Sequence, residues 1–373
     1  MADPIYLDYQ ATTPLAPEVW DVMTPWLRDK FANPHSAHRL GREAAAAISV
    51  ARGHVAQLLP PDGEVIFTSG ATEAINLGII GALKGMREAG RREIVTVATE
   101  HAAVLDSIQH LEGTGYKVTV LPVREDGLVS PDRLEEVLSK NTALVAVMLV
   151  NNEIGVIQPI SELAELAHKS GALFFCDAVQ GYGRVAIPSN CDLVALSGHK
   201  IYGPKGVGAL WRRNGVALSP IIFGGGQEAG LRAGTLSPAL CVGLGETARL
   251  MVERRENDEA HIKRLWDAVM DAGILHKWSI NGSTEYHYHG NLNIRRSGVD
   301  AGRLMSEVRD VAFSLGSACA SGSGRPSHVL SSLGLTSGEA KSSLRFGWGR
   351  YTKEAELITA LRLINEAAER QLT

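Results

Sequence analysis

Residues 193–206 read LVALSGHKIYGPKG, a pattern from which the class of fold can be predicted. It begins with a short apolar run that ends at Ser197. Lys200 follows three residues later, and after it comes a glycine-rich segment. Such a run is typical of a strand that ends at the carboxyl edge of an open α/β sheet, where these folds bind their ligands. Lys200 is therefore a candidate for covalent chemistry. Taken alone, a solvated loop lysine is favoured by roughly twenty to one, because lysines are mostly exposed.

Length and composition indicate a cytoplasmic protein of two domains. The chain has 373 residues, of which 45% are hydrophobic, enough for a large core. Lys plus Arg number 37 against 41 Asp plus Glu, so neither nucleic acid nor a membrane surface is an expected partner. The longest aliphatic run, residues 143–150, is too short to span a bilayer, and the amino terminus shows no signal-peptide pattern.

The four cysteines show no CxxC pair and no metal-ligand spacing, so we expect neither a disulfide framework nor a metal site. Cys176, Cys191 and Cys241 lie in apolar surroundings and are expected in the core. Cys319 lies in GSACASGSG, residues 316–324, whose small residues predict a mobile loop. A cysteine taken at random is buried and inert by about three to one, whereas an exposed loop thiol is a candidate nucleophile where a neighbour promotes the thiolate.

A possible phosphate site lies at the start of a predicted helix. Residues 65–69 predict an apolar strand, Gly70-Ala71-Thr72 a tight turn, and residues 73–83 a helix. The free N–H groups and the dipole of a helix start attract anions such as phosphate. A capped turn without a ligand is about twice as common, because Thr72 is also an ordinary helix N-cap.

Further polar residues follow predicted strands. His101 could stack on a planar ring or move a proton, and a structural histidine is equally plausible. Asn152 could donate to a ligand oxygen, or belong to a plain turn. Asp177, with Gln180 shortly after it, follows a buried strand, where a carboxylate is costly unless a cation pairs with it. The strands that carry this pattern are residues 94–98, 143–150 and 172–176.

Together these residues describe a site for pyridoxal phosphate. Lys200 can form a Schiff base, Asp177 can pair with a protonated pyridine nitrogen, and His101 can stack on the ring. The start of the helix after Gly70 can receive the phosphate. We expect all four features at the carboxyl edge of one sheet, because each follows a predicted strand. Such an arrangement is hard to explain by chance.

The chain resembles the cysteine desulfurases, which belong to the class V aminotransferase group of fold-type I pyridoxal phosphate enzymes. The matching motifs follow one another in order from about Tyr6 to Arg350, nearly the whole chain. They are YLDYQATTP, NPHSAHRLG, FTSGATEAINLGI, TEHAAVL, VNNEIGVIQPI, DAVQGYG, SGHKIYGPKG, RAGTLS and SLGSACAS.

The resemblance implies roles around the cofactor ring. Lys200 would hold the cofactor covalently and move a substrate proton, and Asp177 would pair with the ring nitrogen. His101 would stack on the ring and take part in catalysis. Asn152 and Gln180 would hydrogen-bond the ring oxygen, and Asn152 would also contact the substrate.

The resemblance also implies how the phosphate is held. Ala71, Thr72, Ser197 and His199 would bind it, and Thr235 would reach in from a second subunit. A homodimer is therefore part of the expectation.

For the substrate, the resemblance implies L-cysteine, with its carboxylate on Arg345, a bidentate task that suits a guanidinium. Cys319 would take the sulfur as a persulfide, L-alanine would leave, and the sulfur would pass to an acceptor protein, an iron–sulfur scaffold or a sulfur carrier. Alternatives are a selenocysteine lyase or another class V aminotransferase, and a noncatalytic scaffold. Formation of alanine from cysteine without a keto acid would separate a desulfurase from the other enzymes of this fold. Absence of bound-cofactor absorbance would favour the noncatalytic scaffold.

The expected architecture is α/β, a large domain with a mostly parallel sheet flanked by helices plus a smaller α+β domain. We expect an arm over residues 1–14 that packs with the small domain, a large cofactor-binding domain over residues 15–250, and a small domain over residues 251–373 that carries the cysteine loop. Residues 238–272 predict one or two long helices. The hydroxyls of Thr12 and Thr13 in the arm could face a site.

Overall fold

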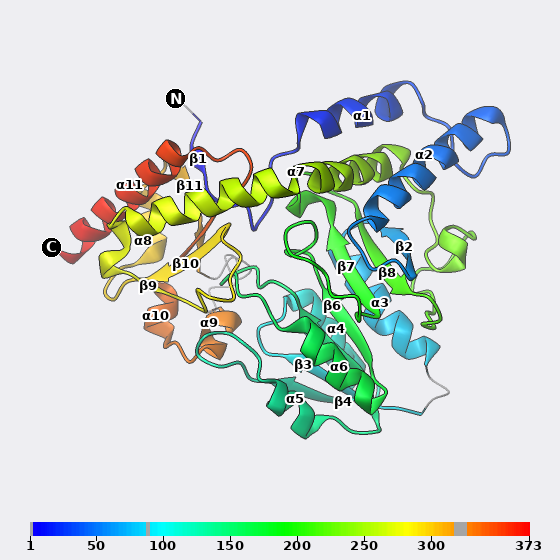
Figure 1. The fold of residues 1–373 in the computed structure, drawn as a ribbon, viewed down its shortest axis with the longest axis horizontal. Coiled ribbons are helices and arrows are strands. Elements are labelled where there is room, and N and C mark those ends of the chain that lie inside the picture. The colour runs from blue at the N-terminus through cyan, green and yellow to red at the C-terminus, as the bar shows by residue number, and fades with distance from the viewer. Residues whose placement is uncertain (1–2, 87–89, 317–326) are drawn as a thin grey trace.

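The central element is a seven-stranded sheet with the strand order β2-β8-β7-β6-β5-β3-β4 (Figure 1). The structure, a computed structural model, describes residues 3–86, 90–316 and 327–373 of the chain. The strands of this sheet are β2 (Gly63–Thr68), β3 (Glu93–Val97), β4 (Lys117–Leu121), β5 (Thr142–Met148), β6 (Leu173–Asp177), β7 (Leu193–Ser197) and β8 (Gly208–Arg213).

The strands from β7 to β4 are all parallel, and β8 runs antiparallel to both β7 and β2. Every strand of this sheet except β8 therefore ends at the same edge. Each residue of β5 is buried, which requires helices on both faces of the sheet. The mostly parallel α/β sheet flanked by helices that the sequence predicts is confirmed.

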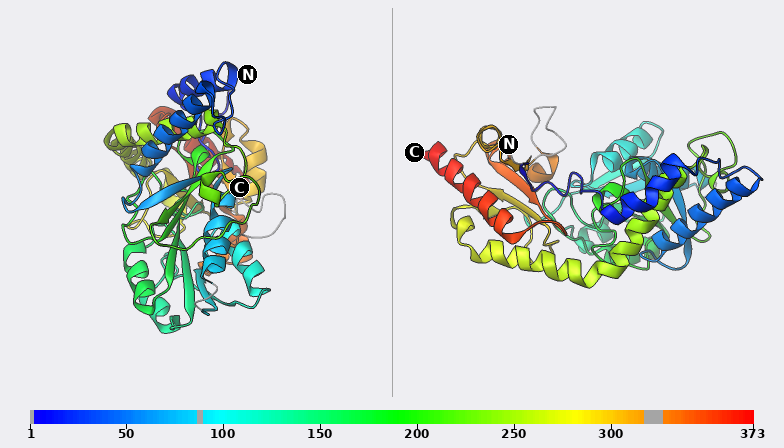
Figure 2. Two further views of the ribbon diagram at one scale, coloured as in Figure 1. Left: turned by 90° about the vertical axis from the view of Figure 1, so that its right-hand side faces the viewer. Right: turned by 90° about the horizontal axis from the view of Figure 1, so that it is seen from above.

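Helices cover the large sheet on both faces (Figure 2). One face packs on α3 (Ala71–Gly85) and α4 (Ala102–Glu112). The other face packs on α5 (Pro131–Val137), α6 (Ile160–Ser170) and the first half of α7 (Pro238–Asp271). Two amino-terminal helices, α1 (Pro17–Arg28) and α2 (Arg39–Ala56), lie against α7.

A second, four-stranded antiparallel sheet has the order β12-β13-β10-β9. The long helix α7 reaches it from the large sheet as one unbroken element (Figure 2). The predicted division at residue 250 falls within α7 and stays a prediction. The elements of this part are β9 (Ser279–Ile280), β10 (Asn291–Arg295), α8 (Ala301–Glu307), β11 (Val311–Ala312), β12 (Ser314–Leu315), α9 (His328–Ser332), α10 (Ser337–Lys341), β13 (Ser343–Gly347) and α11 (Glu354–Leu372).

The amino-terminal arm connects the two sheets. Its strand β1 (Ile5–Tyr6) pairs in parallel with β11, and Asp8 forms a bridge with Gly347 at the end of β13. Further along, the N–H of Thr13 donates to the carbonyl of His199 at 2.9 Å. Residues 8–12 are thereby fixed between the small sheet and the carboxyl edge of the large one.

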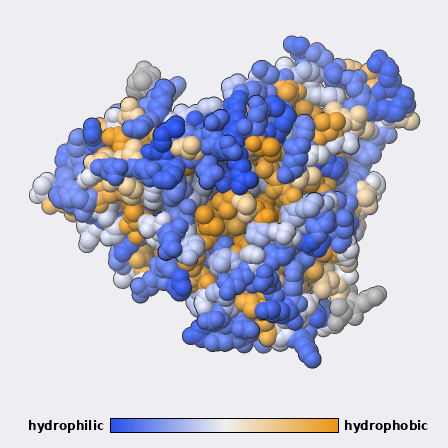
Figure 3. Space-filling view, in the orientation of Figure 1, coloured by the Kyte–Doolittle hydropathy of each residue, from blue (hydrophilic) through white to orange (hydrophobic). Residues whose placement is uncertain are grey.

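Hydrophobic side chains gather below α7 (Figure 3), where a cavity of about 330 Å³ is lined by Ile157, Val185, Met251 and Ile262, among others. Among the helices that the structure describes, none is long and apolar enough to cross a bilayer.

Candidate active site

A cavity of about 690 Å³ opens at the carboxyl edge of the large sheet. Its wall brings together most of the residues predicted from the sequence. Of the remaining two, Thr235 is exposed and lies outside this wall, and Cys319 lies outside the described residues. The predicted residues in the wall are Ala71, Thr72, His101, Asn152, Asp177, Gln180, Ser197, His199, Lys200 and Arg345.

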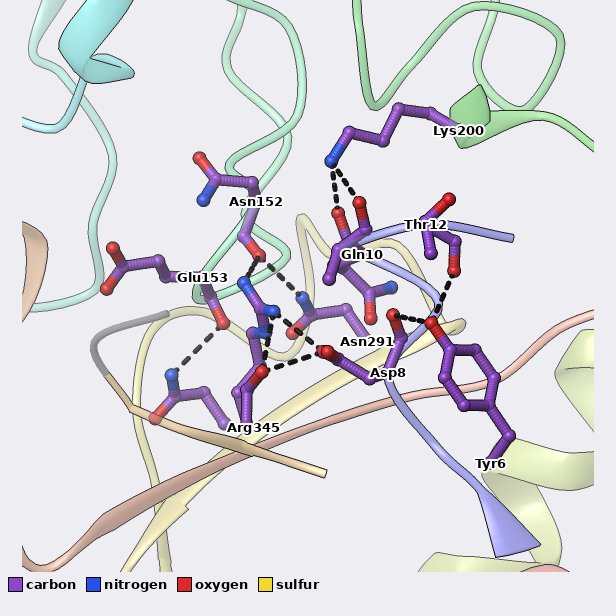
Figure 4. Close-up of polar contacts among 12 residues, drawn as sticks. Tyr6, Asp8, Gln10, Thr12, Asn152, Glu153, Lys200, Asn291 and Arg345 are labelled. Carbon is purple, nitrogen blue, oxygen red and sulfur yellow. Dashed lines mark hydrogen bonds and ion pairs between the residues drawn. The ribbon is translucent and has the colours of Figure 1, made fainter. Parts of the chain in front are cut away.

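Lys200 extends toward the amino-terminal arm. Its Nζ donates hydrogen bonds to the carbonyl oxygens of Gln10 at 2.7 Å and Ala11 at 2.8 Å (Figure 4). Gln180 contacts the same segment, because its Nε2 donates to the Gln10 carbonyl at 2.9 Å. Arg184 joins the two, donating from Nη1 to Gln180 Oε1 at 3.0 Å and from Nη2 to the Lys200 carbonyl. The amine is thus held in place within the cavity.

Asp177 is the last residue of β6 and is 3% exposed. Its Oδ1 accepts a hydrogen bond from the N–H of Val179 at 3.0 Å. Burial raises the pKa of Asp177, while that hydrogen bond and the nearby His101 and Lys200 act in the opposite direction. A fixed cation placed directly against this carboxylate would therefore be strongly favoured.

His101 is oriented by the helix that it precedes. It is the N-cap of α4, and its Nδ1 accepts a hydrogen bond from the N–H of Ala103 at 3.1 Å. Burial lowers the pKa of His101, and the positive charge of Lys200 adds to the effect although Asp177 opposes it. The ring is therefore held neutral and in a fixed orientation, which suits stacking.

The start of helix α3, in the same cavity wall, suits a phosphate. Helix α3 begins here, after Gly70, and a Cβ built on Gly70 would meet nothing within 4 Å, so the first turn is open to the cavity. The sequence-based alternative of Thr72 as N-cap is wrong, because the helix starts at Ala71, two residues earlier than that cap would allow, and Gly70 takes the N-cap position. The exposed N–H groups of a helix start are ready to receive an anion.

His199 and Glu73 lie in the cavity wall near this helix start. His199 contacts Thr12 Oγ1 at 3.2 Å through Nδ1, and burial, with the charges of Lys200 and Lys205, lowers its pKa to about 4. Glu73, in the first turn of α3, would repel a phosphate, but Arg232 binds it with Nε at 2.6 Å and Nη2 at 3.0 Å. The charge of Glu73 is therefore compensated.

Arg345, on β13, is 1% exposed. Its Nη2 donates to Asp8 Oδ1 at 2.8 Å and to Ser314 Oγ at 3.1 Å, and its Nη1 donates to the Asn152 carbonyl at 3.1 Å. The guanidinium therefore joins the arm, β12 and the loop after β5 (Figure 4).

Sequence reasoning missed several residues of the site. Gln10 and Ala11 line the cavity because the arm crosses it, although only hydroxyls of the arm were singled out from the sequence. Thr12, which was singled out, does line the cavity. Glu100, which lies outside the cavity wall next to His101, was also missed: it is buried, and its Oε1 accepts a hydrogen bond from the N–H of Met148 at 2.7 Å. Burial raises the pKa of Glu100 well above its usual range, and Asp177 adds to this. The sequence feature that could have indicated Glu100 is its position directly before His101, after the end of a strand.

The other cysteines are where their surroundings predicted. Cys176, Cys191 and Cys241 are free and buried. Within the described ranges, no group of three or more His, Cys, Asp or Glu side chains could hold a metal ion.

The chain belongs to the class-V aminotransferase family, whose model matches residues 5–359. It is 45% identical over 370 residues to the cysteine desulfurase IscS of Rickettsia bellii (strain OSU 85-389), a match that covers 97% of this chain and 90% of the relative. It is 44% identical over 374 residues to the mitochondrial cysteine desulfurase of Eremothecium gossypii, covering 98% of this chain and 76% of the relative. The resemblance to cysteine desulfurases is thus confirmed.

Solved structures agree with this assignment. A NifS-like protein superposes with a TM-score of 0.91 at 31% identity, covering 98% of this chain and 100% of the other. SspA in complex with cysteine superposes with a TM-score of 0.82 at 36% identity, covering 94% of this chain and all of the other, 100%. Class V aminotransferases and cysteine desulfurases depend in general on pyridoxal phosphate.

Proposed function

We propose that this protein is a cysteine desulfurase that uses pyridoxal phosphate to convert L-cysteine to L-alanine and transfers the sulfur to Cys319. The observation that carries the proposal is the cavity at the carboxyl edge of the large sheet, whose wall combines Lys200, Asp177, His101 and Arg345. An amine, a buried carboxylate, a neutral ring and a buried guanidinium are the groups that this reaction needs.

The residues present fit pyridoxal phosphate. The buried carboxylate of Asp177, whose pKa burial raises, suits a pyridinium N–H. The open first turn of α3 suits the phosphate, with Ala71, Thr72, Ser197 and His199 as its ligands. Lys200, whose Nζ donates to the carbonyls of Gln10 and Ala11 in the same cavity wall, would supply the amine for the covalent link.

Around the ring, His101 would stack on one face, and Asn152 and Gln180 would donate hydrogen bonds to the ring oxygen. Two contacts support these roles: the Asn152 carbonyl accepts a hydrogen bond from Arg345 at 3.1 Å, and Gln180 Nε2 donates to the Gln10 carbonyl at 2.9 Å. When bound, pyridoxal phosphate supplies an electron sink for negative charge at the substrate α carbon.

The chain's own groups would carry the other steps. Arg345 would bind the carboxylate of L-cysteine, and Lys200 would remove the proton from its α carbon and return one to the product. Cys319, which lies outside the described residues, would act as a thiolate. Its sulfur would attack the substrate sulfur, so that a sulfur–sulfur bond forms. The bond between that sulfur and the substrate β carbon would break, and its electron pair would pass to the β carbon. Protonation of that carbon gives L-alanine, and Cys319 is left as a persulfide.

Three wider features belong to the proposal. The protein would be a homodimer in which Thr235 of the partner subunit completes the phosphate site; the exposed position of Thr235, away from its own cavity, is consistent with this. The persulfide sulfur would pass to an iron–sulfur scaffold or a sulfur carrier protein, for iron–sulfur cluster or other cofactor assembly. The cytoplasmic location expected from the sequence stays a prediction.

The test is an absorbance spectrum of the purified protein, followed by addition of L-cysteine and a thiol reductant and assay of alanine and sulfide. The expected result is absorbance in the visible region and equal amounts of alanine and sulfide, without any keto acid. The matched variant Cys319→Ser should keep the absorbance and lose both products. Undiminished products in Cys319→Ser would remove this cysteine from the mechanism.

A further inference from the structure

Arg345 has a carboxylate partner within the chain, Asp8. Its side chain is 2% exposed and forms an ion pair with Asp8, whose side chain is 20% exposed, at 2.8 Å. Ser314 closes the group, because its Oγ accepts from Arg345 Nη2 at 3.1 Å and donates to Asp8 Oδ1 at 2.9 Å. Figure 4 shows Asp8 on the arm directly opposite the guanidinium.

The remaining donors of Arg345 do not form an intact fork. A guanidinium has five N–H donors, and a carboxylate binds it best through two neighbouring ones. Both hydrogens of Nη2 are used, by Asp8 and Ser314, and Nη1 donates to the Asn152 carbonyl. The buried Nε has no hydrogen-bond partner among the residues that the structure describes. A carboxylate can bind a guanidinium in a bidentate way either across Nη1 and Nη2 or across Nε and Nη2. Because Nη2 takes part in both arrangements, a second carboxylate gains a bidentate contact with Arg345 only if Nη2 releases Asp8 or Ser314.

We propose that Asp8 is a resident carboxylate on Arg345 that the substrate carboxylate must displace, so that Asp8 sets how tightly the site binds carboxylates. The inference rests on the proposed function for the identity of the substrate, L-cysteine. Asp8 is thereby a specificity-determining residue: a ligand with a carboxylate meets a competitor, and a ligand without one does not.

The position of Asp8 fits an exchange. Its side chain is partly exposed, so water can solvate the carboxylate once it leaves Arg345, whereas Arg345 stays buried and must always have an anion beside it. The backbone of Asp8 is held independently of its side chain. Tyr6 donates from its hydroxyl to the Asp8 carbonyl at 3.2 Å, and Asp8 bridges Gly347. The carboxylate can therefore turn away while the arm remains in place.

The test compares Asp8→Asn with the wild type, both loaded with pyridoxal phosphate. The probe is 3-mercaptopropionate, which has the thiol and carboxylate of cysteine but no amine, and its binding is measured by calorimetry without turnover. An uncharged amide competes weakly for the guanidinium, so Asp8→Asn should bind the probe about tenfold more tightly, the worth of one hydrogen bond to a charged group. The neutral 3-mercaptopropionamide should bind both proteins equally. In the cysteine assay, KM should fall and kcat should not rise.

A matched control separates this effect from the loss of any buried ion pair. Arg350 and Asp258 form a pair with side chains 7% and 13% exposed, outside the wall of the active-site cavity. Asp258→Asn should leave the affinity for 3-mercaptopropionate unchanged. If Asp8→Asn folds poorly, Ser314→Ala removes the other Nη2 contact without changing the charge and should also tighten binding.

Weaker or unchanged binding of 3-mercaptopropionate by Asp8→Asn would overturn the proposal and make Asp8 a residue that only orients Arg345. The calorimetry needs no reaction. Tighter binding in a protein that releases no sulfur would therefore reject the proposed function and leave the role of Asp8 intact.

Discussion

Replacing Asp177 with asparagine should separate cofactor binding from stability. The side chain is 3% exposed, and its Oδ1 accepts one hydrogen bond from Val179 that an amide oxygen can also accept. Burial raises the pKa of Asp177, so the ionised form opposes folding at neutral pH. Without the cofactor, the free energy of unfolding of Asp177→Asn should therefore equal or exceed that of the wild type.

Cofactor binding should change in the opposite direction. The charged hydrogen bond to the ring nitrogen is worth about 1.5–3 kcal/mol, so the affinity for pyridoxal phosphate should fall by about 10- to 150-fold. The assay is an equilibrium titration of the cofactor-free protein with pyridoxal phosphate, followed by absorbance, beside urea denaturation of the same samples. Alanine production should be lost more completely than binding, because the ring nitrogen must be protonated to accept electrons.

Asp192 provides the matched control. It is also a buried aspartate next to the sheet, but it accepts from the Phe174 N–H at 2.8 Å and contacts His168 Nε2 at 2.7 Å. Asp192→Asn should lower the free energy of unfolding by about 1–3 kcal/mol and leave cofactor affinity unchanged. The reasoning about Asp177 is refuted if Asp177→Asn unfolds more easily without the cofactor and binds pyridoxal phosphate as tightly as the wild type.

Three further predictions test other parts of the site. Lys200→Ala should give no covalent cofactor adduct by mass spectrometry after borohydride reduction, whereas the wild type should carry one; an adduct in the variant would assign the link to another lysine. Arg232→Gln should weaken pyridoxal phosphate binding about tenfold, because Glu73 then carries an uncompensated charge at the start of α3, and Arg232→Gln combined with Glu73→Gln should restore it; no recovery would contradict this. Because the pKa of His199 falls from 6.5 to about 4 on folding, the cofactor-free protein should lose stability as pH drops below about 6.5, since the unfolded chain binds the proton first. His199→Asn should reduce that loss between about pH 7.5 and about pH 5 in urea denaturation, and an unchanged slope would exclude His199 as its source.

The large sheet and the residues at its carboxyl edge were predictable from the sequence because local patterns specify them. A short apolar run followed by a polar residue marks a strand end, and parallel strands bring their ends together. Lys200, Asp177 and His101 could therefore be placed in one site without knowledge of any contact. Thr72 was mistaken as a possible cap because its hydroxyl suits that position, whereas the glycine before the helix start takes it.

The partners of Arg345 could not be predicted in this way. Asp8 is separated from Arg345 by 337 positions in the chain, and no periodicity relates the two. Their contact depends on β1 lying beside β11 and on Asp8 bridging Gly347, which is a matter of tertiary register. Glu100 was missed for a related reason, because a glutamate in the sequence is expected at the surface. Its burial depends on the hydrogen bond that it accepts from the N–H of Met148 on β5, which the sequence does not reveal.

The central claim is that sulfur from L-cysteine is first transferred to Cys319. The most direct measurement is mass spectrometry of the protein after a single turnover with L-cysteine labelled in its sulfur, without reductant. The account predicts one labelled sulfur on the peptide that contains Cys319 for each alanine formed, and none on the peptides of Cys176, Cys191 or Cys241. Alanine formed together with free labelled sulfide and an unmodified Cys319 would contradict it.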